Sequence, residues 1–258
     1  MVAGYKEHHV DPRLAPYVTC YWTYDATSEL QGSHPVMPDG CIDLLFESRP
    51  STLDIVGTMT RTLWAKVCGP TQFVGVRFKA GGAVPFLRER ADLLTNGVVE
   101  AEAVLGLAGS DLKQQLLEGG SLEERVRLLE RFLVRRLQAD VAAVDSRIVW
   151  ATSRLIDDPG SKIESLACGL GMSRQYLRRL FLRHTGLSPK AFARVARLGR
   201  LVEALQAGAH LADSALASGY ADQAHMTHEF KDLVGITPAA YQDRHWFPFV
   251  QDRDQANG

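Results

Sequence analysis

The chain has 258 residues, 46% of them hydrophobic, and carries 29 basic and 30 acidic residues. That length is enough for two hydrophobic cores, while a formal net charge of −1 excludes bulk charge as an argument for a nucleic-acid partner. The four cysteines lack metal-ligand spacing, and neither a signal sequence nor an 18-residue apolar run occurs. We therefore expect a cytoplasmic protein without a metal or cofactor.

A β-rich domain is predicted over residues 1–110. Residues 17–24 are aromatic and β-branched, an apolar run at 41–46 follows a Pro-Asp-Gly turn, and residues 73–78 alternate in polarity. Short strands separated by turns predict a small β-barrel or sandwich with helices appended.

Four side chains on or beside these strands are candidate ligand contacts: Trp22, His34, Asp43 and Arg77. Barrels of this kind bind small molecules at the mouth or in the interior. An ordinary structural role is the alternative for each of them. Cys20 and Cys41 lie in predicted strands, so we expect them to be buried and unreactive.

A helical linker is predicted over residues 111–144. Leu122, Val126, Leu129 and Leu133 form one apolar stripe at helical spacing, flanked by arginine and glutamate. The stripe fits two alternatives equally: packing on its own domain, or an antiparallel contact in a homodimer.

Residues 145–246 contain one short pattern twice, forty-nine residues apart. Such repeats identify an architecture before any single residue does. The two copies are Phe181-x4-Gly186-Leu187-Ser188-Pro189-x2-Phe192 and Phe230-x4-Gly235-Ile236-Thr237-Pro238-x2-Tyr241.

Each copy predicts a helix, a glycine turn, a second helix and a capped exit. Gly171 permits the positive φ of a tight turn, Ser173 stands at the N-cap of the next helix, and Gly186 is a helix stop. Ser188 followed by proline predicts a further helix start. The corresponding residues of the second copy are Gly219, Asp222, Gly235 and Thr237.

A single helix is predicted from residue 188 to about 206, between the two units. Its apolar stripe comprises Phe192, Val195, Ala196, Leu198, Leu201, Val202 and Leu205. Nineteen residues span roughly 28 Å, and one turn of B-DNA is roughly 34 Å. Such a strut could hold two reading helices in successive major grooves on one face of a duplex.

Local charge favours DNA binding by the first unit. Eight positive charges and no acid occur between residues 173 and 200, and seven of the eight are arginine, which makes bidentate contacts to phosphate and guanine. A solvated helix face is the alternative, but such faces mix both signs. The eight are Arg174, Arg178, Arg179, Arg183, Lys190, Arg194, Arg197 and Arg200.

The second predicted reading helix has a different chemistry. Its exposed positions are Gln223, Ala224, His225, Thr227 and His228, after the cap Asp222. Glutamine pairs bidentately with adenine, and alanine or threonine can meet a thymine methyl group. Acids lie nearby, so this unit should attract phosphate less than the first.

The segment 145–246 resembles the DNA-binding domain of the AraC/XylS family of bacterial transcription regulators, in which a long helix joins two helix-turn-helix units. Ser214 and Met226 depart from the family pattern, which predicts somewhat looser packing in the second unit. The matching residues are Ile163, Leu166, Ala167, Gly171, Ser173, Tyr176, Leu177, Arg179, Phe181, Gly186, Ser188, Pro189, Ala215, Gly219, Tyr220, Asp222, Phe230, Lys231, Gly235, Thr237, Pro238 and Tyr241.

The resemblance implies that bases are read by Gln175, Arg178 and Arg179 in the first unit, and by Gln223, His225 and His228 in the second. The wider predicted DNA contact set is Ser173, Arg174, Gln175, Arg178, Arg179, Arg183, Asp222, Gln223, Ala224, His225, Thr227 and His228. Residues 1–110 resemble an N-terminal domain carried by some family members, where this region senses a ligand or mediates dimer formation.

We therefore predict a DNA-binding transcription regulator, not an enzyme. We expect an activator that is gated at its N-terminal domain by a small molecule or partner, with operator DNA and RNA polymerase as partners. The alternative is a small-molecule-binding protein or enzyme whose helical repeat serves assembly only. Residues 247–258 are expected to be a disordered tail.

Overall fold

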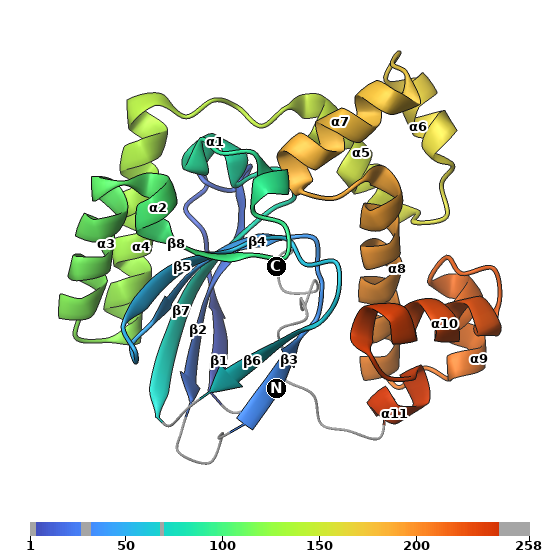
Figure 1. Cartoon of the computed structure of the whole chain (residues 1–258), viewed down its shortest axis with the longest axis horizontal. Helices are drawn as coiled ribbons and strands as arrows, with labels where there is room; N and C mark the ends of the chain where they lie inside the picture. Colours follow the sequence, from blue (N-terminus) through green and yellow to red (C-terminus); the bar gives the residue numbers. More distant parts are fainter. Residues whose placement is uncertain (1–3, 27–31, 68–69, 243–258) are drawn as a thin grey trace.

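The computed structural model describes residues 4–26, 32–67 and 70–242. A sheet with its helices forms the N-terminal part, and two helical units lie along one flank of it with α8 running between them (Figure 1). The predicted disordered tail lies outside the described residues. Among those that are described, no helix combines the length and apolar character needed to cross a bilayer.

The N-terminal part contains an antiparallel six-stranded sheet with the order β1-β2-β7-β4-β5-β8, and a separate two-stranded pair, β3-β6. The predicted strands at 17–24, 41–46 and 73–78 are β2, β4 and β7, which lie side by side at the centre. The bounds are β1 Tyr5–His8, β2 Val18–Ala26, β3 Gly32–Val36, β4 Ile42–Glu47, β5 Thr52–Val56, β6 Leu63–Val67, β7 Thr71–Phe78 and β8 Val98–Glu100.

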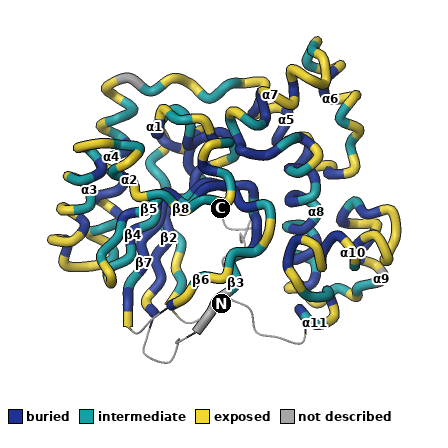
Figure 2. Tube along the Cα trace, in the orientation of Figure 1, coloured by how far each residue is buried: buried dark blue, intermediate teal, exposed yellow. Residues whose placement is uncertain are grey.

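Most residues of β2 and β7 are buried on both faces, whereas every second residue of β4 is only half-buried (Figure 2). Because successive side chains alternate, Tyr21, Leu44 and Val76 join a core shared with the N-terminal helices, while Trp22 and Tyr24 join a second core that includes Val67 of β6. The fold is thus α+β, as predicted.

Helices of the N-terminal part cover one face of the sheet. They are α1 Val84–Leu87, the short 3-10 helix η1 Ala91–Leu93, α2 Ala101–Leu105, α3 Leu107–Glu118 and α4 Leu122–Asp140. Val126, Leu129 and Leu133 of α4 are buried in the core of this sheet, and Leu122 packs against it. The predicted stripe therefore packs on its own domain, which leaves those side chains unavailable for a dimer contact.

The C-terminal helices carry the predicted repeat. They are α5 Ser146–Asp157, α6 Ile163–Gly169, α7 Arg174–Thr185, α8 Pro189–Gln206, α9 Leu211–Ala217, α10 Gln223–Val234 and α11 Pro238–Gln242. The predicted caps are present: Ser173 accepts from the Tyr176 amide, Ser188 from the Ala191 amide and Asp222 from the His225 amide.

The two halves of the strut helix α8 pack into two different hydrophobic cores, and all seven residues of its predicted stripe are buried. Phe192 and Val195 pack in the core of the first unit, whereas Leu201 and Leu205 pack in that of the second. The predicted looser packing is not seen at Met226, which is fully buried. Buried Ser214 donates a hydrogen bond to the His210 carbonyl (2.9 Å).

Candidate nucleic-acid interface

The first reading helix, α7, separates its apolar and basic side chains cleanly. Leu177 and Phe181 are completely buried beneath it, while Gln175, Arg178 and Arg179 are exposed. The Arg179 guanidinium lies 5.6 Å from the centre of the Tyr176 ring, on the same exposed side. Two guanidinium groups and one amide thus stand free near the start of a capped helix, as major-groove reading requires.

Two other arginines of α7 have different surroundings. Arg174 is exposed but its guanidinium pairs with Glu164 of α6 at 2.6 Å. Arg183, in the last turn, lines a hollow together with Glu89 of the N-terminal part. Arg174 therefore carries less free charge than predicted, and Arg183 lies at the end of α7 away from the expected readers.

The second reading helix, α10, presents Gln223, Ala224, Thr227 and His228 together with its cap Asp222, all lining one shallow surface hollow. His225 differs from them because its Nδ1 accepts a hydrogen bond from the Ala221 amide at 3.3 Å. Its ring also packs edge-on against Tyr220. His225 thus helps to shape the turn before α10.

The stretch 173–200 contains no acid of its own, but acids from elsewhere in the fold pair with part of its positive charge. Arg194 and Arg197 of α8 are paired with the buried Glu229 of α10, whose carboxylate accepts from Arg197 Nε and Nη2 at 2.9 Å each and from Arg194 Nε at 3.1 Å. Arg194 also pairs with Asp232. These two arginines hold the second unit on α8, so their charge is already neutralised within the protein.

Arg197 also connects the two units. Its Nη1 donates to the Pro159 carbonyl (3.1 Å) in the loop between α5 and α6. The same guanidinium therefore contacts the first unit, the strut and the second reading helix.

Three of the four candidate ligand residues come together on neighbouring strands. Arg77 of β7 is 2% exposed, and its guanidinium pairs with Asp43 of β4 at 3.2 Å and with Asp39 at 3.3 Å. Burial raises the pKa of Asp43 to about 6, against the lowering effects of Arg77 and of the Trp22 indole. Whether this cluster meets a ligand stays a prediction. His34 is on β3, and its side chain lies outside the description.

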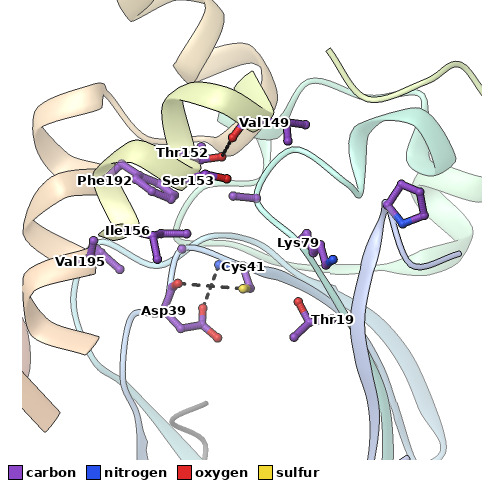
Figure 3. Close-up of a pocket in the computed structure, with 14 residues that line it drawn as sticks. Thr19, Asp39, Cys41, Lys79, Val149, Thr152, Ser153, Ile156, Phe192 and Val195 are labelled. Atoms are coloured by element: carbon purple, nitrogen blue, oxygen red, sulfur yellow. Dashed lines mark hydrogen bonds between the residues drawn. The ribbon is translucent and has the colours of Figure 1, made fainter. Parts of the chain in front are cut away.

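A cavity of about 310 Å³ between the sheet domain and the helical units was not predicted. Figure 3 shows Asp39, Cys41 and Lys79 on the sheet side, facing Ser153 and Ile156 of α5 and the α8 side chains. The Pro-Asp-Gly-Cys motif marked this turn in the sequence, but its opposition to α8 arises only in the fold. The lining residues from α8 are Phe192, Val195 and Ala196.

Reactive chemistry is sparse among the described residues. No cluster of three histidine, cysteine or acidic side chains is arranged there to hold a metal ion. Cys20 and Cys41 are buried, as predicted, and burial raises the pKa of both thiols, which disfavours the reactive thiolate. Cys168 is exposed.

Two capped helix-turn-helix units on one continuous helix define a DNA-binding domain of the double helix-turn-helix class. Residues 166–244 match a family described as Helix-turn-helix domain. Residues 6–100 match a second family, Domain of unknown function (DUF6597). The C-terminal region therefore carries an AraC-type helix-turn-helix DNA-binding domain.

Two curated relatives match the C-terminal region. The chain is 33% identical over 99 residues to the bifunctional transcriptional activator/DNA repair enzyme Ada of Escherichia coli, covering 38% of this chain but only 27% of Ada. It is 29% identical over 106 residues to the probable transcription factor PqrA of Proteus vulgaris, covering 41% of this chain and 87% of PqrA.

Solved structures of ToxT from Vibrio cholerae align along most of the chain. One at 1.65 Å resolution covers 93% of this chain and 98% of ToxT, with 12% identity and a TM-score of 0.44. A second, with bound unsaturated fatty acid, covers 93% of both chains at 9% identity and a TM-score of 0.42.

Proposed function

We propose that this transcription regulator is an activator that reads a DNA site with α7 and α10 and is gated through its N-terminal domain. The single observation that supports DNA recognition is the set of side chains that two capped helices, both packed against α8, present to solvent. The exposed Gln175, Arg178 and Arg179 serve the first half-site, and the exposed Gln223 with the half-buried Thr227 serves the second. Guanine, adenine and thymine edges are the chemistry that these side chains recognise.

Activation is supported by a relative. Ada, to which the C-terminal region is 33% identical, is by name a transcriptional activator. An activator of this kind acts by contacting RNA polymerase beside its DNA site, and we propose RNA polymerase as the protein partner. A reporter gene behind the bound site should lose expression when the regulator is deleted. A rise in expression would instead make the protein a repressor.

The proposed gate is the cavity between the sheet domain and α5 and α8. Its volume of about 310 Å³ lies at the lower end of the range for small-molecule sites. Its walls are largely apolar, and the polar exceptions are Thr19, Asp39, Lys79, Thr152 and Ser153. A small, largely apolar effector there would contact both parts of the chain and could change how they are held together.

DNA binding is tested by gel shift with the full chain on its upstream DNA and on a random-sequence duplex, over a range of salt concentrations. Arg179→Ala should weaken binding to the specific duplex about 5- to 150-fold, which corresponds to about 1–3 kcal/mol for a lost bidentate contact. Arg131→Ala, an exposed arginine of α4, is the matched control and should bind like the wild type.

The competing function is small-molecule binding or catalysis, with the helical repeat used for assembly. Wild-type affinity that never exceeds the non-specific level for any duplex would favour this competitor and reject the proposal.

The gate is tested by thermal-shift screening of small molecules. A ligand of the cavity should raise the melting temperature and change the affinity for DNA. Ser153→Trp, which replaces a small lining residue of the cavity by a bulky indole, should remove both effects. Ser165→Trp, on the exposed surface of α6, should retain them. A ligand that acts equally on both variants binds elsewhere.

A further inference from the structure

The N-terminal part contacts both helix-turn-helix units through two adjoining segments, residues 57–62 and 91–97, here called the platform. The Gly57 amide donates to the Gly97 carbonyl at 2.9 Å, and the Asn96 amide donates to the Thr58 carbonyl at 3.0 Å. The Asn96 side-chain oxygen also accepts from the amide and hydroxyl of Thr60. These bonds tie the two segments into one body.

The platform binds the C-terminal end of the first reading helix. The Thr58 hydroxyl donates to the Thr185 carbonyl at 2.8 Å, and the Thr95 hydroxyl donates to the Gly186 carbonyl at 2.9 Å. Thr58 and Thr185 are both buried. These carbonyls belong to the last residue of α7 and to its C-cap, where a helix leaves its acceptors without partners inside the helix.

The platform binds the second reading helix at the corresponding place. The Thr62 amide donates to the Leu233 carbonyl of α10 at 2.8 Å, and Arg61 lies 3.5 Å from Asp232. Gly235 ends α10 as Gly186 ends α7, so Leu233 occupies the repeat position next to that of Thr185. One body therefore holds both reading helices by their C-terminal turns.

The same contacts leave the DNA-reading surfaces open. Gln175, Arg178 and Arg179 are exposed near the start of α7, and Gln223 is exposed at the start of α10. The platform is therefore no steric block to a duplex. Together with α8 it closes a ring of contacts through α7 and α10, and a closed ring permits fewer relative movements of the two helices than a single strut does.

We infer that the platform fixes the distance and mutual orientation of α7 and α10, so that Thr58, Thr62 and Thr95 are positioning residues for DNA reading. The N-terminal domain then helps to set which spacing between half-sites the protein accepts. Inserting one base pair between half-sites moves the second by roughly 3.4 Å and turns it by about 35°. A rigid pair of reading helices cannot follow that change, whereas a loosened pair can.

The inference rests on the proposed function, and one experiment separates their failures. The full-length wild type first selects its preferred duplex from a random pool, and one base pair is then inserted between the two protected half-sites. The test variant is Thr58→Val/Thr95→Val, which removes both hydroxyl donors at nearly constant volume. Thr52→Val, on β5 opposite Glu47, is the matched control. Arg61→Ala, whose side chain is 75% exposed, is a second test variant that the fold should tolerate.

We expect the wild type and Thr52→Val to lose at least about thirtyfold in affinity on insertion, as for a lost half-site contact. The double variant should bind the original duplex about tenfold more weakly, because it has lost two hydrogen bonds that preorganise the helices. Its further loss on insertion should be threefold or less, and Arg61→Ala should shift in the same direction by a smaller factor.

An unchanged insertion penalty in both test variants overturns the inference. Tighter binding of the original duplex by the double variant also overturns it, because the platform would then be restraining the helices in an unsuitable arrangement. If the wild type selects no duplex at all, the proposed function fails and the inference fails with it.

Discussion

Glu229 is the residue whose alteration tests the attachment of the second unit most directly. It is 6% exposed, and its carboxylate receives two hydrogen bonds from Arg197 and one from Arg194. Glu229→Gln keeps the shape of the side chain and one acceptor oxygen but removes the charge. It also turns an N–H group toward a guanidinium that can only donate.

The expected cost follows from the burial of the pair. Removing one member of a buried ion pair costs about 3–5 kcal/mol, since the remaining charge is left uncompensated. Arg194 is 30% exposed and water screens its share, and one acceptor oxygen survives, so we expect about 3 kcal/mol. For a chain of this size each kcal/mol lowers the melting temperature by about 2–4 °C, which predicts a fall of about 6–12 °C.

Calorimetry and DNA binding measure separate consequences of this change. Melting of Glu229→Gln should fall as stated, and binding should weaken most at the half-site read by α10, because that helix loses its anchor on α8. Glu123→Gln, at an exposed position in the first turn of α4, is the control and should change stability by no more than about 0.5 kcal/mol. A loss below 1 kcal/mol in Glu229→Gln, with normal binding at both half-sites, would refute the structural role assigned to this carboxylate.

Three further predictions concern helix ends, pH and salt. Gly186→Ala and Gly235→Ala each force a non-glycine residue to positive φ, which costs about 1–2 kcal/mol. The two sites differ in their surroundings: a Cβ at Gly186 would meet the Thr95 hydroxyl of the platform at 2.6 Å, whereas a Cβ at Gly235 would meet nothing within 4 Å. Gly186→Ala should therefore cost the more in denaturant unfolding, and equal costs would contradict the platform contact. Burial lowers the pKa of His184 below its ordinary 6.5, so its contribution to stability is complete above pH 6.5 and lost as the pH falls below it. The melting temperature of His184→Gln should therefore differ less between pH 7.5 and pH 5.5 than that of the wild type. An unchanged difference in melting temperature would exclude this histidine as the cause. Arg178→Gln should reduce the slope of log affinity against log salt by about 1, while Arg194→Gln should leave it unchanged because that charge is already paired; equal reductions would place both arginines on phosphate.

Local features of the C-terminal units could be predicted from the sequence because their causes are local. A serine or aspartate before a helix satisfies amides two or three residues away, and glycine after a helix takes a positive φ that other residues resist. Gly171, Gly186, Gly219 and Gly235 all have φ between 63° and 88°.

The pairing of charges could not be predicted in this way. Arg197 and Glu229 are thirty-two residues apart in the chain and meet only because α10 folds back onto α8. The platform is equally non-local, since Thr58 bonds to a carbonyl 127 residues away. Counting charges along a segment therefore overestimates the charge that is free to meet DNA.

The paired arginines change how the work is divided between the two units. Of the eight cations between residues 173 and 200, Arg174, Arg194 and Arg197 are bound to acids of the same chain, and the last two are used to hold α10. The first unit therefore attracts phosphate less strongly than its sequence predicts, and the arginines paired in this way fix the second unit on α8. Rigid placement matters more for α10, because its exposed amide, methyl and imidazole groups act through close contact with base edges rather than through long-range charge. A weakly charged reader can contribute specificity only if it is held in register, and both the Glu229 pairs and the platform supply that restraint.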